Sequence, residues 1–144
     1  MDYDDGYVAY LNSSTSLAKG SQYTVTVTPA VGATVGQAYT NDEIAVWIDY
    51  NNDFTFSTAE RVGYVLVAAG WSNQFAFTVP TTATTGAVRM RVRISYSVVA
   101  DGGAPIDPCA VATYGETEDY LVNVVPAPTC PQPTNLNVIT ADLT

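Results

Sequence analysis

The sequence predicts an all-β domain, an antiparallel two-sheet β-sandwich of the jelly-roll or immunoglobulin-like kind. Apolar and polar residues alternate with a period of two in several short segments, which is typical of strands with one buried face. No segment keeps a helical apolar period with capping residues at its ends. Short strands separated by Gly, Pro and Asn occur more often in sandwiches than in barrels.

Each predicted strand follows from its own residues. In residues 23–28, Tyr23, Val25 and Val27 alternate with threonines, which indicates a half-buried antiparallel strand. Residues 43–50 are almost continuously apolar up to Asp49, as expected for a strand covered on both faces. Alternation or apolar content also predicts strands at residues 61–69, 74–79, 88–97 and 119–125.

The chain of 144 residues divides into one domain and a short extension. Residues 1–125 are long enough for a single sandwich. Residues 126–133 contain four prolines and predict a stiff linker. In residues 134–144 Leu136 and Val138 alternate with polar residues, so we expect the first strand of a module similar to fibronectin type III, with a swapped strand or a plain tail as alternatives.

Composition excludes several classes of function. The net charge is −9, which opposes nucleic acid and anionic membrane surfaces. The chain has no histidine, which removes Ser-His-Asp catalysis and imidazole metal sites. No apolar run is long enough to insert into a membrane. Charged residues are only 13% of the chain, which suits an extracellular, secreted β-protein better than a cytosolic enzyme.

The segment 49–60 has the ligand spacing of a calcium loop. Oxygen-bearing side chains occupy its positions 1, 3 and 5, and a carboxylate occupies position 12. Phe54 stands where the EF-hand pattern has a glycine, and a solvated turn is the alternative. The expected Ca²⁺ ligands are Asp49, Asn51, Asp53, the Thr55 carbonyl and Glu60.

The predicted strand 88–97 places three arginines on one face. Met90, Val92 and Ile94 would enter the core, so Arg89, Arg91 and Arg93 would lie opposite them. Such a ladder is either part of a surface ion-pair lattice or, if it lines a concavity, a site for an anionic ligand.

Carboxylates to pair with these arginines occur at the entrance of the last strand. Strand parity puts Glu116 and Glu118 on the core side and Asp119 on the other side. We expect Asp119 to pair with an arginine, and Glu116 or Glu118 to approach the Asp49 loop as further calcium ligands. A catalytic carboxylate pair is a weak alternative, because the two lie at i and i+2 with no identifiable cleft.

Aromatic residues and cysteines raise two further hypotheses. Trp71 lies in a predicted turn and is the best candidate for an exposed carbohydrate contact, whereas Trp47 is expected in the core. Cys109 precedes the last strand and Cys130 follows it, so the two can form a disulfide only if a flank folds back. Pairing with another segment or another subunit is equally open.

Several motifs in order resemble the GEVED domain family. They are residues 46–53, 59–62, 89–93 and 108–109, followed by residues 114–120, where Gly115-Glu116-Thr117-Glu118-Asp119 matches the Gly-Glu-Val-Glu-Asp motif with Thr117 in place of Val. The resemblance covers approximately residues 3–125. It implies a β-sandwich module of a secreted or surface protein of bacteria, often beside fibronectin type III-like domains, and no established catalytic activity.

These observations together predict a non-catalytic, calcium-stabilised structural or adhesive module of an extracellular bacterial surface protein or appendage. Its partners would be neighbouring domains of the same polypeptide or identical subunits. One alternative is a carbohydrate-binding accessory module of a secreted multidomain enzyme, which would contact surface glycans. The other is a self-assembling filament subunit that uses strand addition.

Overall fold

The computed structural model describes residues 6–31, 34–35, 42–66, 72–96, 106–110 and 114–130. Within these ranges nearly all regular structure is β. The elements are β1 (Tyr7–Ala18), β2 (Gln22–Val27), β3 (Ala30–Val31), β4 (Thr34–Val35), β5 (Asp42–Ile48), the 3₁₀ turn η1 (Thr58–Glu60), β6 (Arg61–Val65), β7 (Asn73–Thr78), β8 (Gly86–Tyr96) and β9 (Gly115–Val125).

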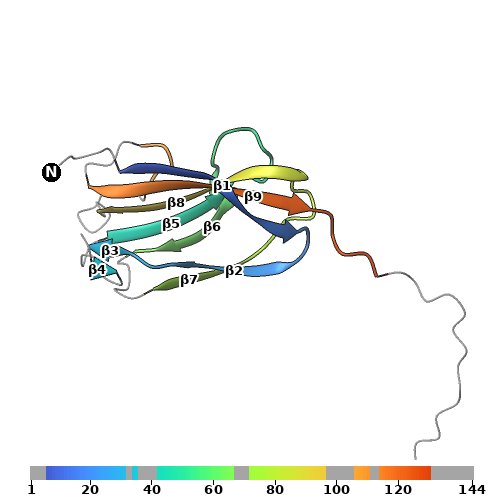
Figure 1. Ribbon diagram of the computed structural model, residues 1–144, viewed down its shortest axis with the longest axis horizontal. Coiled ribbons are helices and arrows are strands. Elements are labelled where there is room, and N and C mark those ends of the chain that lie inside the picture. The colour runs from blue at the N-terminus through green and yellow to red at the C-terminus, as the bar shows by residue number, and fades with distance from the viewer. Residues whose placement is uncertain are drawn as a thin grey trace, which may run out of the picture.

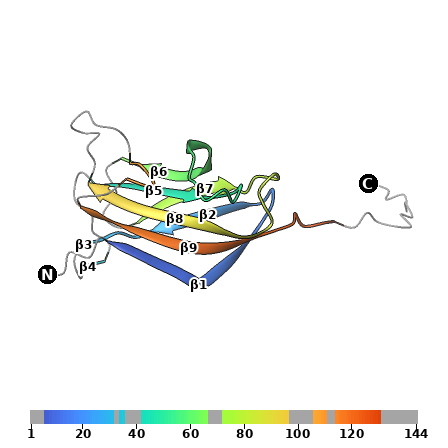
Figure 2. The same cartoon turned by 90° about the horizontal axis from the view of Figure 1, so that it is seen from above.

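The strands form two packed layers, which confirms the predicted all-β sandwich. One layer is a five-stranded sheet in the order β1-β9-β8-β5-β6, and the other is the pair β2-β7. Figure 1 shows β2 and β7 beneath the larger sheet. The short hairpin β3-β4 lies at one end of the sandwich (Figures 1 and 2).

Strand β1 differs from the prediction in two ways. The sequence pattern did not identify it, because polar residues such as Asn12 and Ser14 interrupt its apolar alternation. It also pairs parallel with β9, with a register shift between Tyr10 and Ser14, so the larger sheet is mixed rather than purely antiparallel. Figure 2 shows β1 alongside β9 at the edge of this sheet.

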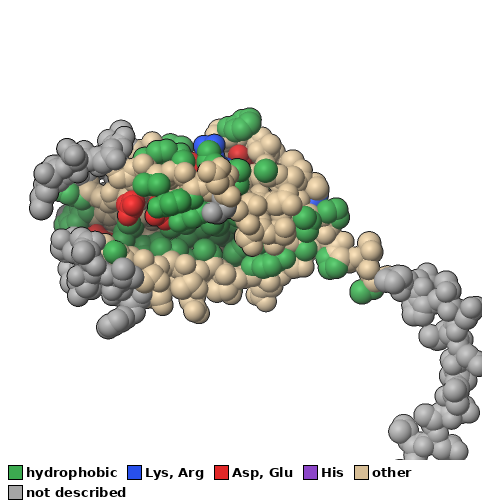
Figure 3. Space-filling model, viewed as in Figure 1, with side chains coloured by type: hydrophobic (Ala, Val, Ile, Leu, Met, Phe, Trp, Pro, Cys, Tyr) green, Lys and Arg blue, Asp and Glu red, His purple; other side chains and the backbone are tan. Residues whose placement is uncertain are grey.

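The main core lies between the two layers. Alternate residues of β5, β8 and β9 face inward and meet apolar side chains of β2 and β7, as the two-residue period predicts. In Figure 3 hydrophobic side chains gather in a hollow between the layers. The buried members of this core are Leu17, Ile48, Tyr50, Val79, Ala83, Val88, Val122 and Val124.

A second, smaller cluster covers the opposite face of the larger sheet, which we call the outer face. Ala45 and Trp47 of β5 contact Ile106 there, with Phe56 and Tyr64 packed at the side. All seven residues of β5 are therefore buried, as predicted for a strand covered on both faces. Trp47 belongs to this core, with 2% of its surface exposed.

The described chain leaves the sandwich after β9. This strand ends at Val125, and residues 126–130 are exposed and extend away from the domain (Figure 1). Residues 134–144, expected to begin another module, lie outside the described residues.

Candidate functional site

The segment after β5 folds around the carboxylate of Asp49, which is 1% exposed. Its Oδ1 accepts a hydrogen bond from the backbone N–H of Asp53 at 3.1 Å. Its Oδ2 accepts another from the backbone N–H of Phe54 at 3.0 Å. A carboxylate at the end of a buried strand needs such donors to offset its loss of water. Asp49 therefore anchors the loop that follows it.

The next polar side chains of the loop converge on one another. The backbone nitrogen of Asp53 that bonds Asp49 also donates to Asn51 Oδ1 at 3.0 Å. Asn51 Nδ2 in turn donates to Asp53 Oδ2 at 2.8 Å. Asp53 Oδ1 accepts from the Thr55 backbone at 2.9 Å and from its hydroxyl at 2.6 Å. These hydrogen bonds from Thr55 lower the pKa of the Asp53 carboxyl.

The backbone of this loop adopts a conformation that side chains disfavour. Asn52 and Phe54 have φ angles of 58° and 66°, in the left-handed region. Asn tolerates this region, whereas Phe there costs about 1 kcal/mol or more. Phe54, at the position where the EF-hand pattern has glycine, thus adopts the glycine-like backbone while its side chain is 85% exposed.

Glu60 supports the loop from its far end. Its Oε2 accepts from the backbone N–H of Ser57 at 2.9 Å and from its hydroxyl at 2.8 Å, which closes a capping box over η1. Its Oε1 lies 3.4 Å from the backbone nitrogen of Asn51. Glu60 therefore holds the two ends of the loop together.

Glu116 and Glu118 do not approach this loop, contrary to the prediction. Across the sheet, Glu118 is level with Val46 and Glu116 with Ile44 of β5. At about 3.4 Å per residue these positions lie about 10 Å and about 17 Å before Asp49 along the strand. Strand alternation also places both glutamates on the inner face of the sheet, with Val122. It places Asp49 on the outer face, with Trp47. Parity predicted the faces of the three acids but not their distance from the loop.

No group of three acidic or cysteine side chains that could hold a metal ion occurs within the described ranges. The loop itself brings together two carboxylates, Asp49 and Asp53, and the amide oxygen of Asn51. A hard cation prefers six to eight oxygens, so water and backbone carbonyls would have to complete the set. The side chains present therefore fit part of a calcium site.

The predicted pairing of Asp119 with the arginine ladder is confirmed on the outer face. Asp119 is fully buried, and Arg91 donates to both of its oxygens, from Nε at 2.7 Å and from Nη2 at 2.8 Å. Arg89 Nη1 lies 3.3 Å from Oδ2, and the Tyr7 hydroxyl donates to the same oxygen at 2.9 Å. The three donors come from β8 and β1 and meet at β9.

The Arg93 guanidinium and the Nη1 group of Arg91 hold segment 106–110 against the sheet. Arg93 donates to the carbonyl oxygens of Asp107 and Ala110, and Arg91 Nη1 donates to the carbonyl oxygen of Pro108 at 2.8 Å. Burial lowers the pKa of Arg93, which is 4% exposed. The ladder is thus covered at Arg91 and Arg93, whereas 42% of the Arg89 side chain is exposed.

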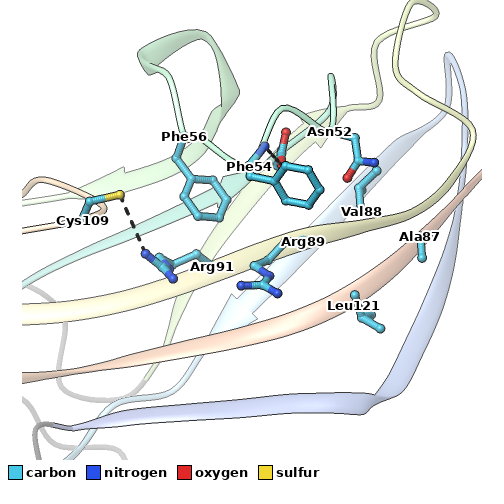
Figure 4. Close-up of a pocket in the computed structure, with 10 residues that line it drawn as sticks. Asn52, Phe54, Phe56, Ala87, Val88, Arg89, Arg91, Cys109 and Leu121 are labelled. Carbon is cyan, nitrogen blue, oxygen red and sulfur yellow. Dashed lines mark hydrogen bonds between the residues drawn. The ribbon is translucent and has the colours of Figure 1, made fainter.

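A pocket of about 260 Å³ opens on the outer face beside Arg89. Phe54 and Phe56 from the Asp49 loop form one side, and Arg89 and Arg91 from β8 form the other (Figure 4). The sequence analysis considered an anionic-ligand site if the arginine ladder lined a concavity, but it did not predict that the Asp49 loop forms the other wall. The loop meets the ladder only through the β5–β8 pairing. The other lining residues are Asp49, Asn52, Ala87, Val88, Cys109 and Leu121.

The last strand begins at a glycine that the geometry requires. Gly115 has a φ of 140°, and a Cβ there would lie 2.2 Å from the Ile94 carbonyl oxygen.

Gly115 and Asp119 are the first and last residues of one five-residue motif. A family model for the GEVED domain matches residues 43–123, which is more than half of the chain. The chain belongs to the GEVED domain family. No curated protein matches the chain.

The GEVED motif thus has separate tasks along one strand. Gly115 permits close approach of β9 to β8, and Asp119 receives the arginines and Tyr7. Glu118 accepts a hydrogen bond from the Tyr120 hydroxyl at 2.6 Å. Burial, followed by repulsion from Glu118, raises the pKa of Glu116.

The two cysteines do not form a disulfide with each other in the structure. Cys109 and Cys130 are both exposed, free thiols, and Cys109 Sγ lies 4.0 Å from Arg91 Nη1. Trp71 lies outside the described residues. No helix in the described part of the domain is long and apolar enough to cross a membrane.

Proposed function

We propose that this GEVED domain is a non-catalytic, calcium-stabilised structural or adhesive module of an extracellular bacterial surface protein or appendage. The supporting observation is that the last residue of the motif, Asp119, lies inside the fold. Asp119 is fully buried beneath Tyr7, Arg89 and Arg91, so a substrate has no access to it. The partners of the domain would be neighbouring domains of the same polypeptide or identical subunits.

The calcium part of the proposal rests on the convergence of side-chain oxygens in the Asp49 loop. Asp49 Oδ1 and Asn51 Oδ1 both lie within 3.1 Å of the Asp53 nitrogen, which brings the two oxygens close together. Like charges at Asp49 and Asp53 repel each other in one short loop, and a divalent cation would offset that repulsion. Asp49, Asn51, Asp53 and the Thr55 carbonyl would hold the ion. Glu60, which the sequence also predicted as a ligand, would instead brace the loop through its hydrogen bonds with Asn51 and Ser57.

Calorimetric titration of the full chain with calcium tests this assignment. Extracellular calcium modules bind with a Kd of about 10⁻⁴–10⁻³ M, and we expect a value in or near that range. Asp53→Asn should weaken binding by about tenfold or more, because a ligand charge is lost. Glu116→Gln is the matched control, because the register places Glu116 far from the loop, and it should bind calcium like the unmodified chain.

The absence of calcium uptake would refute the metal assignment. Equal losses in Asp53→Asn and Glu116→Gln would also refute it, because they would place the ion elsewhere or show a nonspecific charge effect.

Strand addition is a second candidate function, favoured by the edge strand β1. In the described part of the larger sheet β1 has a neighbour on one side, and exposed edges of this kind accept further strands. Four of its large apolar side chains are between 37% and 43% exposed: Tyr7, Val8, Tyr10 and Leu11. Light scattering should detect oligomers that Leu11→Lys disperses, and a strictly monomeric full chain would refute filament assembly.

The alternative of a carbohydrate-binding accessory module with Trp71 as its platform stays a prediction, since Trp71 is outside the described residues.

A further inference from the structure

We propose that the pocket on the outer face binds a carboxylate-bearing sugar residue, a uronic acid. The carboxylate would pair with Arg89, and the ring would lie against Phe54 and Phe56, with Asn52 available to its hydroxyl groups. This site goes beyond the proposed structural role and does not involve Trp71. The proposal rests on three kinds of side chain in the lining, a cationic one, an aromatic pair and an amide, and on their placement around one pocket.

Arg89 is the group in the pocket that can receive an anion. Arg91 already satisfies both oxygens of Asp119, at 2.7 and 2.8 Å, whereas Arg89 reaches that carboxylate through one nitrogen at 3.3 Å. With 42% of its side chain exposed, Arg89 has donors that face solvent. A planar guanidinium with free donors matches the geometry of a carboxylate.

Phe54 and Phe56 supply the apolar wall. Phe54 is 85% exposed and has a left-handed backbone, an arrangement that costs free energy without any gain from burial. The Asp49 carboxylate holds that backbone in place through the Phe54 N–H. Figure 4 shows both rings next to the arginine side of the pocket. A strained, exposed aromatic ring beside an accessible cation is best explained by a ligand with an apolar face and an anionic group.

The size and polarity of the pocket narrow the ligand further. A volume of about 260 Å³ lies just below the range of about 300–1,000 Å³ for drug-sized ligands, so one ring fits. The polar side chain of Asn52 in the lining suits hydroxyl groups, which a simple aromatic acid such as benzoate lacks. The net charge of −9 repels long polyanions, so we expect an isolated or terminal uronic acid.

The test compares the methyl glycosides of glucuronic acid and glucose, which differ only in the carboxylate, by calorimetry of the full chain in calcium-containing buffer. Calcium keeps the loop filled if it binds there, so failure of this proposal is distinct from failure of the calcium proposal. We expect the uronate to bind about tenfold more tightly or more, because a charge-assisted hydrogen bond is strong.

Three variants identify the groups responsible. Arg89→Gln should abolish the preference for the uronate, and Phe54→Gly should weaken uronate binding while suiting the left-handed backbone. Arg61→Gln is the matched control: Arg61 is also exposed but contacts the Tyr64 ring and does not line the pocket, so the preference should persist.

Thiol protection gives a second readout from the same molecule. Cys109 lines the pocket and Cys130 does not, and both are exposed. The uronate should slow maleimide labelling of Cys109 and leave labelling of Cys130 unchanged. Equal binding of uronate and glucoside, an unchanged preference in Arg89→Gln, or tighter binding of benzoate than of uronate would overturn the proposal.

Discussion

Arg91 donates two parallel hydrogen bonds to the Asp119 carboxylate, of 2.7 Å from Nε and 2.8 Å from Nη2, across the β8–β9 pairing. The pair is almost completely enclosed, with 16% of the arginine side chain and none of the aspartate exposed. The ring of Phe56 lies over the guanidinium, 5.0 Å from its central carbon. This pair ties the last strand, the Asp49 loop and segment 106–110 to one point on the sheet.

Asp119→Asn should destabilise the domain by about 3–5 kcal/mol, because it leaves Arg89 and Arg91 without their carboxylate. Urea unfolding followed by tryptophan fluorescence measures the change, since Trp47 lies in the adjacent cluster. Glu118→Gln, one residue away but turned to the inner face, is the control and should cost less. Equal stability of Asp119→Asn and the unmodified chain would contradict a structural role for the pair.

The same network predicts acid sensitivity. Burial raises the pKa of Asp119, but the hydrogen bonds from Arg91 and Tyr7 hold it below the ordinary value of 3.8. A carboxyl whose pKa is lower in the folded state stabilises the fold fully above its unfolded pKa. That contribution is lost as the pH falls below about 4 and through the folded pKa.

Unfolding midpoints measured from about pH 6 down to about pH 2 should therefore fall steeply at the acid end. Asp119→Asn should flatten this dependence. An Asp119→Asn variant with the same acid slope would assign the sensitivity to other carboxyls.

Gly115→Ala should destabilise the domain severely. Its φ of 140° is unfavourable for any residue with a Cβ, and the added atom would lie 2.2 Å from the Ile94 carbonyl. We expect a loss of about 3 kcal/mol or more, measured by thermal unfolding. Gly86→Ala is the matched comparison, because Gly86 also has a positive φ but nothing lies within 4 Å of its Cβ position. It should cost less, and equal losses would show that strain in φ alone matters.

Phe54→Gly should stabilise the fold by about 0.5–1 kcal/mol, because glycine adopts the left-handed region freely and the exposed ring contributes little packing. Asn52→Gly, at a φ of 58°, should change stability less, since Asn tolerates that region. Chemical denaturation measures both. If Phe54→Gly were destabilising instead, the ring would have a packing role that its 85% exposure does not suggest.

The period-two pattern was sufficient to place β2, β7, β8 and β9, because one face of each strand turns toward the core. A continuous apolar run placed β5, which is buried on both faces. Neither pattern identified β1, which lies at a sheet edge with much of its apolar surface exposed, so burial does not impose a regular alternation there. Parallel pairing of β1 with β9 has no local sequence signal either.

Parity along one strand placed Asp119 beside the arginines, but the distance from Glu116 to the Asp49 loop depends on strand register. Register arises from packing of several strands at once, which a single segment does not reveal. The complete pocket could not be predicted from the sequence for the same reason. Phe54 and Arg89 are far apart in the chain and line one pocket only in the folded structure.

The central claim, that calcium bound at the Asp49 loop stabilises this module, is tested most directly by the melting temperature of the full chain with calcium and with EDTA. We expect EDTA to lower it by several degrees or more, calcium but not magnesium to restore it, and Asp49→Asn to respond less. An identical melting temperature in calcium and in EDTA, with no difference for Asp49→Asn, would contradict the claim.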